Sequence, residues 1–324
     1  MASLSQSRVL VTGASGFIGS HLTKRLVAEG AEVHAVTPAV SSVYPERLLD
    51  VRTSIVLHEA NITDRSAMDA LAKHAKPSIV FHLAAYTHVG KSWQRVDECV
   101  QTNVQGTVNL LQALDSIGYD RFVNTGTSEI YGDIDVPFRE DANVNPNSPY
   151  SVSKYAAERF CRMFRQGHGW PIVLVRPFNA YGPAQSPDRI IPETIVRALR
   201  KQELKTTSGK QTREFNYVDD LVDGFVLAAT VPGVEGELIN LGGGEEIAIR
   251  DVVTAVLDVM GNPITAQIGA LPDRPTEIWR MFCDSTKARE LLGWKPRHTL
   301  REGLESTIEW YRAELNGSGS AYEA

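Results

Sequence analysis

A glycine-rich turn near the beginning of the chain constrains the fold more than any other feature. Residues 8–12 (RVLVT) form an apolar, β-branched run that predicts a buried strand. Residues 20–29 have helical spacing, and residues 32–37 (EVHAVT) predict a second strand. The turn between the first strand and the helix contains three glycines in GxxGxxG spacing: Gly13, Gly16 and Gly19. A strand, a tight turn, a helix and a strand in this order predict a βαβ unit with parallel strands.

The same alternation continues to about residue 176. Further strands are expected at residues 54–57, 78–83, 121–125 and 171–176. Helices are expected at residues 65–73, 103–117 and 150–166. Strands that alternate with helices imply an α/β fold with a doubly wound parallel sheet, the Rossmann arrangement, and with helices on both faces.

After residue 176 the pattern changes, and prolines interrupt a loop-rich stretch. We expect helices at residues 192–201, 219–229, 249–260 and 300–314 and a strand at 238–241. These elements predict a smaller C-terminal lobe that is interleaved with the sheet. The expected division is a first domain over 1–177 plus about 215–242, and a second lobe over 178–214 and 243–315. Residues 316–324 (NGSGSAYEA) have linker composition, which predicts a disordered tail.

The composition argues against several classes of partner. The chain is 43% apolar and 22% charged, which is enough to form a sizeable core. The net charge is −6 and no basic tract is present, so we expect neither nucleic acid nor a membrane as partner. No apolar run is long enough to span a bilayer, and no signal peptide is expected. Three widely spaced cysteines show no metal-ligand pattern, so we expect reduced thiols, no metal site and a cytoplasmic location: Cys99, Cys161 and Cys283.

The glycine-rich turn predicts a dinucleotide site. Glycines let the backbone approach a pyrophosphate, which the free N–H groups at the helix start then bind; Phe17 and Ile18 belong to this start. The alternative is a purely structural turn. The second strand ends at Thr37 and Pro38, which are neither the acidic residue typical of NAD nor the arginine typical of NADP. We favour NAD, and NADP is not excluded.

A Tyr-x-x-x-Lys pair predicts redox chemistry at an alcohol. Tyr150 and Lys154 lie four residues apart, so a helix places both on one face. An ammonium beside a phenol favours the phenolate and lowers the pKa of the tyrosine. Such a tyrosine can remove a hydroxyl proton while a hydride leaves the same carbon. Thr127 follows the strand at 121–125, and its hydroxyl can bind the reacting alcohol. A solvated helix face is the alternative for the pair alone.

Taken together, the motifs resemble those of the extended short-chain dehydrogenase/reductase family, the nucleotide-sugar epimerases and dehydratases. The matching segments are VTGASGFIGSHL, HLAA, NVQGTVNLLQA, TSEIYG, SPYSVSKYAAE, RPFNAYGPAQ, QTREFNYVDDLVDG and LGW. The resemblance implies that Thr127, Tyr150 and Lys154 are catalytic, that the three glycines bind pyrophosphate, and that the C-terminal lobe binds a nucleotide sugar. It also implies a cofactor site lined by Leu83, Ala84, Ala85 and Asn103. Asn61 and Ile62 can bind the adenine edge or form a plain turn.

The segment Thr127-Ser128-Glu129 bears on which reaction is catalysed. A 4,6-dehydratase needs a carboxylate that removes the C5 proton, whereas a simple 4-epimerase does not. In similar family members the glutamate of Thr-Ser-Glu has this role, so Glu129 favours dehydration; a structural glutamate at a strand end is the alternative. Ser128 resembles the GDP-mannose 4,6-dehydratases and also the UDP-glucuronate decarboxylases. A 4-epimerase, a 4-keto-reductase and a nicotinamide-binding regulatory protein without activity remain open.

A nucleotide diphosphate needs cationic, preferably bidentate, donors. Arg213 and Arg274 are the main candidates and the resemblance supports both. Asn179 is expected to donate to the phosphate or the sugar, Ser128 to contact the substrate, and Arg189 to bind it or to lie in solvent. For each arginine a structural ion pair is the alternative. The resemblance also implies a homodimer formed through the helices at 103–117 and 150–166.

Overall fold

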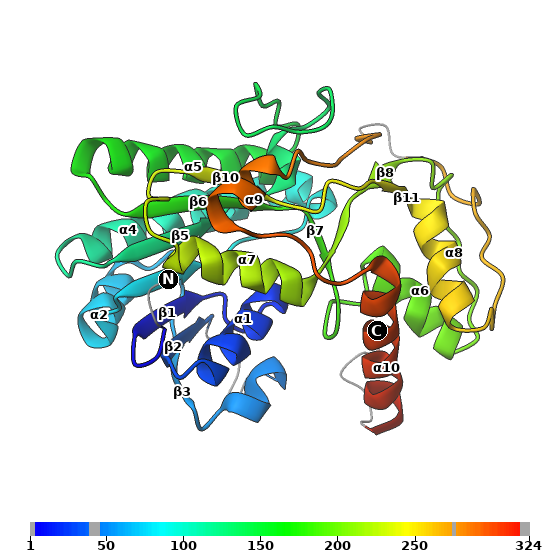
Figure 1. Cartoon of the computed structure of the whole chain (residues 1–324), viewed down its shortest axis with the longest axis horizontal. Coiled ribbons are helices and arrows are strands. Elements are labelled where there is room, and N and C mark those ends of the chain that lie inside the picture. The colour runs from blue at the N-terminus through cyan, green and yellow to red at the C-terminus, as the bar shows by residue number, and fades with distance from the viewer. Residues whose placement is uncertain (1–3, 39–45, 274–276, 318–324) are drawn as a thin grey trace.

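The computed structural model describes residues 4–38, 46–273 and 277–317. Its centre is a seven-stranded sheet in the order β10-β6-β5-β4-β1-β2-β3, with every neighbouring pair parallel (Figure 1). The strands are β1 (Arg8–Thr12), β2 (Glu32–Thr37), β3 (Ile55–Glu59), β4 (Ile79–His82), β5 (Arg121–Thr125), β6 (Ile172–Pro177) and β10 (Leu238–Leu241). The predicted doubly wound parallel sheet is confirmed, and its switch point lies between β1 and β4.

Helices cover both faces of the sheet, because successive residues of each strand point to opposite sides. Val9 and Val11 join a core with α1 (Phe17–Ala28) and α7 (Val218–Thr230). Leu10 joins the opposite core with α2 (Arg65–Ala75), α4 (Gly106–Asp115) and α5 (Pro149–His168). Both cores are almost entirely aliphatic, as expected for strands that are buried on both faces.

The helix expected at 103–117 begins earlier and is not uniform. It comprises α3 (Val96–Cys99), a π-helical segment η3 (Val100–Gln105) and then α4. A π-helical turn interrupts the helical ladder and is frequent at functional sites. Here it contains Asn103, whose side chain binds two neighbouring segments.

The smaller lobe lies beside the carboxyl end of the sheet (Figure 1). Its helices are α6 (Ile190–Leu199), α8 (Ile249–Val259) and α10 (Leu300–Gly317), and they share one apolar core. Four short strands form two further two-stranded sheets. β7 (Asn179–Tyr181) pairs with β9 (Phe215–Tyr217), and β8 (Thr212–Arg213) pairs with β11 (Ile247–Ala248). The division into cofactor and substrate units remains a prediction.

Several short elements did not have a periodic signal in the sequence. They are η1 (Glu46–Val51), η2 (Gly90–Gln94), η4 (Ser128–Ile130) and α9 (Thr286–Leu292). Helix α10 ends at Gly317, so residues 316 and 317 are helical and not part of a disordered tail; residues 318–324 lie outside the described part. None of the described helices combines the length and apolarity that a membrane crossing requires.

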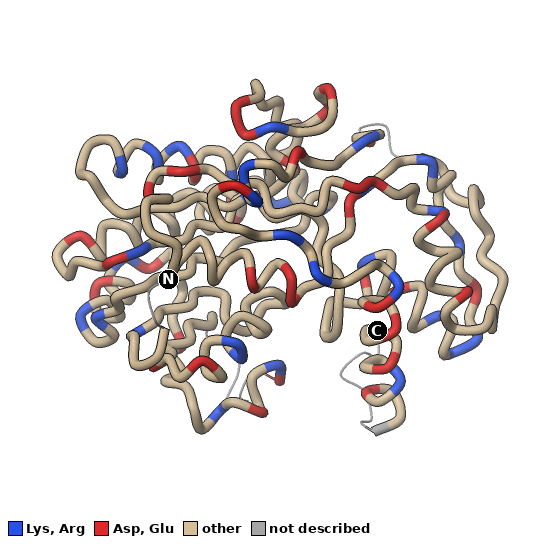
Figure 2. The backbone as a smooth tube through the Cα atoms, viewed as in Figure 1, with Lys and Arg blue, Asp and Glu red and all other residues tan. Residues whose placement is uncertain are grey.

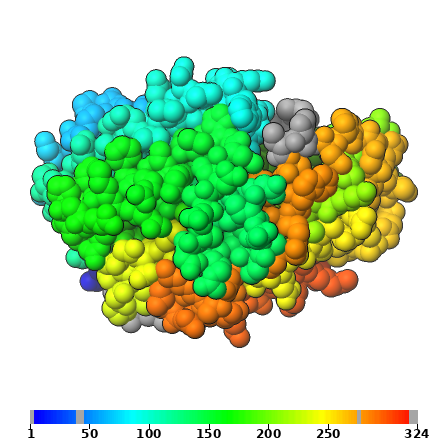
Figure 3. Space-filling model, turned by 90° about the horizontal axis from the view of Figure 1, so that it is seen from above, coloured from blue at the N-terminus to red at the C-terminus, as the bar shows by residue number. Residues whose placement is uncertain are grey.

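Two segments far apart in the chain, around residues 138 and 283, are joined by backbone hydrogen bonds. Phe138 N donates to Phe282 O at 2.9 Å, and Asp284 N donates to Phe138 O at 3.0 Å. In the space-filling view, the green region around residue 140 accordingly meets the orange region around residue 280 (Figure 3). Acidic and basic residues are interspersed over both lobes (Figure 2), so no large field of one sign covers the described surface.

Candidate active site

The glycine-rich turn after β1 is shaped by close backbone contacts. Gly13 has a φ of +71°, and a methyl group there would lie only 2.7 Å from Ala84 N. A methyl group at Gly19 would collide with the carbonyl oxygen of Gly13. The N-cap residue of α1 is Gly16, which has no side chain to cap the helix, and the first turn of the helix carries no acidic residue. The first N–H groups of α1 are therefore open to an anion, and the turn fits a pyrophosphate.

A buried histidine that the sequence had not singled out supports this turn. His82 Nδ1 lies 2.8 Å from Thr12 Oγ1, and His82 Nε2 lies 2.9 Å from Thr107 Oγ1. Ala84 N donates to Thr12 Oγ1 at 3.2 Å, so this chain of hydrogen bonds also fixes the start of the segment 83–85. Burial, followed by the charge of Lys154, lowers the pKa of His82 to about 3. His82 is therefore neutral and holds the loop in place; its only signal was the HLAA segment.

Asn103 connects the predicted cofactor loop with the catalytic helix. Its Oδ1 accepts from Tyr86 N at 2.7 Å, and its Nδ2 donates to Ser153 Oγ at 2.8 Å. Ser153 Oγ in turn donates to Tyr150 O at 2.8 Å. Asn103 is thus placed as a bridge to α5, and its predicted direct contact with the cofactor stays a prediction.

At the predicted adenine edge, the structure shows turn and packing contacts. Asn61 Oδ1 accepts from Thr63 N at 3.0 Å, which is the turn role considered for this residue. Ile62 is buried, and its side chain occupies the space beside Gly106. Arg47 lies nearby and donates to Ala184 O at 2.9 Å and to Ser15 O at 3.3 Å. It connects the glycine turn with the loop after β7.

The expected catalytic residues come together at the carboxyl end of the sheet. Helix α5 begins with a capping box in which Ser148 Oγ accepts from Ser151 N at 3.1 Å. Tyr150 and Lys154 follow on one face, and both are buried. The Thr127 side chain hydrogen-bonds to the phenol of Tyr150, and the carboxylate of Glu129 is close enough to act on that phenol electrostatically. Glu129 N donates to Thr127 Oγ1 at 3.3 Å, which fixes η4 against the threonine.

The expectation that a neighbouring ammonium lowers the pKa of Tyr150 was wrong for the structure without cofactor or substrate. Burial raises the pKa of Tyr150 to about 12, although the hydrogen bond from Thr127 lowers it; Glu129 raises it and Arg189 lowers it. Burial also lowers the pKa of Lys154 to about 8, against the attraction of Glu158. Desolvation penalises both charged forms, and here it outweighs the pairing that the sequence suggested.

The predicted substrate residues differ in what they contact. Asn179 has a buried Nδ2 without a hydrogen-bond partner among the described residues. Ser128 Oγ donates to Met281 Sδ at 3.4 Å. Arg189 is half-exposed, 3.7 Å from Asp188, and close enough to act on Tyr150.

Arg213 makes the structural ion pair considered as its alternative. Its Nη2 donates to Glu277 Oε1 at 2.6 Å and its Nη1 to Ile278 O at 2.7 Å. Both bonds connect β8 with the segment after residue 276, so Arg213 has an internal role whether or not it also binds substrate. Arg274 lies outside the described residues.

Comparisons with known proteins identify the family. The family model described as GDP-mannose 4,6 dehydratase matches residues 10–307. UDP-glucose 4-epimerase of Mycolicibacterium smegmatis is 36% identical, over 94% of this chain and 98% of that protein. dTDP-glucose 4,6-dehydratase 1 of Escherichia coli is 33% identical, over 98% of this chain and 97% of that protein.

A solved structure extends the likeness to the fold. UDP-glucuronic acid 4-epimerase from Bacillus cereus, in complex with UDP-glucuronic acid and NAD, has a TM-score of 0.87 and 31% identity, covering 94% of this chain and 99% of that one. The match spans both lobes and the whole set of motifs. The chain therefore belongs to the extended short-chain dehydrogenase/reductase family of nucleotide-sugar dehydratases and epimerases, and it is an enzyme.

Proposed function

We propose that the chain is a nucleotide-diphosphate-sugar 4,6-dehydratase of the GDP-mannose dehydratase type, which works with bound NAD. The observation that carries the proposal is the carboxylate of Glu129 beside Thr127 and Tyr150. Dehydration needs such a base at C5, in addition to a base for the C4 hydroxyl.

NAD fits the glycine turn. Gly13, Gly16 and Gly19 allow close backbone contacts that form the tight turn, and the N-terminus of α1 offers its N–H groups to a pyrophosphate. The Bacillus cereus relative was solved with NAD, which supports the same cofactor here. When bound, NAD supplies a hydride acceptor and a positive charge.

The residues of the chain then divide the proton transfers. Tyr150 removes the proton of the C4 hydroxyl, Thr127 holds the reacting oxygen by a hydrogen bond, and the Lys154 ammonium stabilises the phenolate. The ketone formed at C4 acidifies the C5 proton, which Glu129 removes and passes to the departing C6 hydroxyl, so that water leaves from C6. The hydride taken from C4 returns to C6 and a solvent proton adds at C5, so the net change is the loss of one water. Asn179, with its unpartnered Nδ2, and Arg189 are proposed to bind the nucleotide sugar.

A 4-epimerase is the second candidate, because the Mycolicibacterium smegmatis epimerase is 36% identical over nearly the whole chain. Inversion at C4 needs Tyr150, Lys154 and Thr127 but no base at C5. Glu129 would then have only a structural role.

Product mass separates these activities. The purified protein is incubated with GDP-mannose, dTDP-glucose, UDP-glucose and UDP-glucuronate, and the products are weighed. A dehydratase gives a product lighter by one water, an epimerase leaves the mass unchanged, and a decarboxylase releases carbon dioxide. Tyr150→Phe is the inactive control. Unchanged mass with C4 inversion would replace the dehydratase proposal with the epimerase.

We also propose a homodimer and a cytoplasmic location. Large apolar side chains are exposed along α3, η3 and α5, the helices that the family resemblance assigns to dimer contact: Val96, Val100, Val152 and Met163. An exposed apolar face of this kind is typical of an interface. The buried, unpaired thiols of Cys99, Cys161 and Cys283 fit a reducing compartment.

A further inference from the structure

A buried ion pair lies within the sheet-facing side of α5. Arg176, in β6, donates from Nε to Glu158 Oε2 at 2.9 Å and from Nη2 to Glu158 Oε1 at 2.8 Å. Glu158 is 0% exposed and Arg176 is 1% exposed. The pair is therefore bidentate and shielded from water, the geometry that best fixes the relative position of two elements.

Each member of this pair is connected to a different part of the candidate active site: Glu158 to the helix of Lys154, and Arg176 to the turn that carries Thr127. Glu158 follows Lys154 by four residues on α5, so the two side chains occupy the same face one turn apart. The side chain of Arg176 packs under Gly126, where an added methyl group would lie 3.0 Å from Arg176 Cγ. Gly126 N donates to Val175 O at 2.6 Å and immediately precedes Thr127.

The arginine also supports the turn that carries Glu129. Its guanidinium lies 4.6 Å from the ring centre of Tyr131, the C-cap residue that follows η4. Tyr131 Oη donates to Asn240 Oδ1 at 2.8 Å, and Asn240 N donates to Glu140 Oε1 at 2.9 Å. Arg176 thus holds both ends of the segment 127–131.

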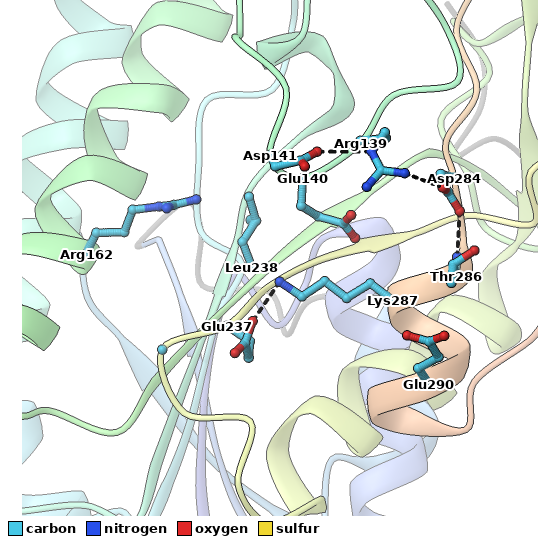
Figure 4. Close-up of a pocket in the computed structure, with 11 residues that line it drawn as sticks. Arg139, Glu140, Asp141, Arg162, Glu237, Leu238, Asp284, Thr286, Lys287 and Glu290 are labelled. Carbon is cyan, nitrogen blue, oxygen red and sulfur yellow. Dashed lines mark hydrogen bonds and ion pairs between the residues drawn. The ribbon is translucent and has the colours of Figure 1, made fainter.

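The network reaches solvent only at its outer ends. Arg162 Nη2 lies 3.2 Å from Glu158 Oε1, and Arg162 and Glu140 both line a charged cavity of about 460 Å³ (Figure 4). A buried ion pair is often no more stabilising than apolar side chains of the same volume. Stability alone therefore does not explain this pair.

We propose that Glu158 and Arg176 are positioning residues, which hold the helix of Tyr150 and Lys154 at a fixed distance from the turn of Thr127 and Glu129. This inference rests on the proposed use of these four groups. Neither member of the pair needs to touch the substrate. Their contribution is to keep Tyr150, Glu129 and the Lys154 ammonium at fixed distances from one another during turnover.

The test compares Glu158→Gln with Glu235→Gln. Glu235 pairs with the buried Arg121 at the opposite end of β5, so its variant also breaks a partly buried ion pair but leaves the site untouched. We expect Glu158→Gln to lower kcat by about 10²-fold with little change in KM, because small misplacements are costly at a reacting centre. The alkaline limb of the kcat profile should move to lower pH, since Glu158 no longer favours the Lys154 ammonium. Glu235→Gln should change neither kcat nor the pH profile.

A double variant separates positioning from folding. Glu158→Gln/Arg176→Gln leaves no buried charge unpaired, since Arg162, which also loses its carboxylate partner, is partly exposed to water, and the variant is expected to fold while keeping the loss of kcat. Wild-type kcat in this folded variant, or equal losses in the Glu158 and Glu235 variants, would overturn the proposal.

Inactivity of the wild-type protein on every nucleotide sugar would instead overturn the proposed function. The positioning role is then decided by crystal structures. The distance between Lys154 Nζ and Thr127 Oγ1 should change in Glu158→Gln and stay constant in Glu235→Gln; an unchanged distance in both contradicts the inference.

Discussion

Lys154 illustrates how burial sets the chemistry of single residues in this site. Its ammonium is proposed to stabilise the Tyr150 phenolate, yet burial lowers the pKa of Lys154 from 10.5 to about 8. The charged form is therefore favoured only below that pH. We expect kcat to fall as the pH rises through about 8, which a pH–rate profile measures.

Lys154 should affect the free energy of unfolding in the opposite direction, so that stability rises with pH where kcat falls. Its pKa is lower in the folded than in the unfolded state, so between about 8 and 10.5 the unfolded chain binds more protons. The contribution of Lys154 to the free energy of unfolding thus rises with pH over this window and is lost as the pH falls through about 8. Denaturation of wild type and Lys154→Met across this range tests it. Parallel pH dependence of the two proteins would contradict the assignment.

Glu129 carries the second residue-scale prediction. Because it is proposed to remove the C5 proton, Glu129→Gln should lower dehydration by about 10²–10⁴-fold. Incorporation of solvent deuterium at C5, followed by mass spectrometry, should fall in parallel. Glu305→Gln, on the exposed side of α10, is the matched control and should retain full turnover. Normal dehydration by the Glu129 variant would remove the main support for a dehydratase.

The sequence predicted the site residues that lie in local motifs better than those whose role depends on contacts with distant segments. Thr127, Tyr150 and Lys154 lie in short recognisable segments; the structure brings Thr127 into contact with Tyr150 and buries Lys154 one turn further along α5. The roles of His82 and of the Glu158–Arg176 pair depend on contacts between distant segments, which no spacing rule reveals. The pKa of Tyr150 was misjudged for the same reason, since burial is a property of the whole fold.

At the scale of elements, prediction succeeded where a single period persists and failed where it changes. The alternation of apolar runs and amphipathic helices identified all seven strands of the central sheet, to within a few residues. The segment 96–115 passes through α-helical and π-helical geometry, so its start was misplaced; Asn103, in the π-helical part, bonds to Tyr86 and Ser153. The short α9 and η1 have too few residues to show a period.

The junction of β1 and α1 leads to a prediction for the glycine turn. Gly19→Ala places a methyl group against the Gly13 carbonyl, so the turn must open and NAD binding should weaken. Gly167→Ala in α5 meets no atom within 4 Å and should instead stabilise the helix by about 0.5–1 kcal/mol. Calorimetric titration with NAD and thermal unfolding distinguish the two variants. Equal NAD affinity in both would refute a close pyrophosphate contact at this turn.

At the scale of the whole molecule, α5 carries both the proposed catalytic pair and part of the proposed dimer interface. One face carries Tyr150 and Lys154 into the site, while Val152 and Met163 are 51% and 50% exposed on the same helix. Val96 and Val100, on the neighbouring α3 and η3, extend this apolar face, which we name the α3–α5 face. Water contact along such a face is unfavourable, and a second copy can cover it by an isologous contact.

We therefore expect wild-type protein to sediment at twice the 35.6 kDa mass of the chain. Val152→Lys/Met163→Lys introduces two ammonium groups into the α3–α5 face, and their desolvation should leave the protein monomeric. Ile268→Lys/Leu271→Lys alters exposed apolar residues of the smaller lobe, away from that face, and should leave the mass unchanged. Analytical ultracentrifugation at micromolar concentration measures these masses. A monomeric wild type would rule out the dimer, and a dimer that survives Val152→Lys/Met163→Lys would place the interface elsewhere. Because the dimer contact would press on the helix that carries the catalytic pair, the monomeric variant should also unfold at a lower temperature than the control.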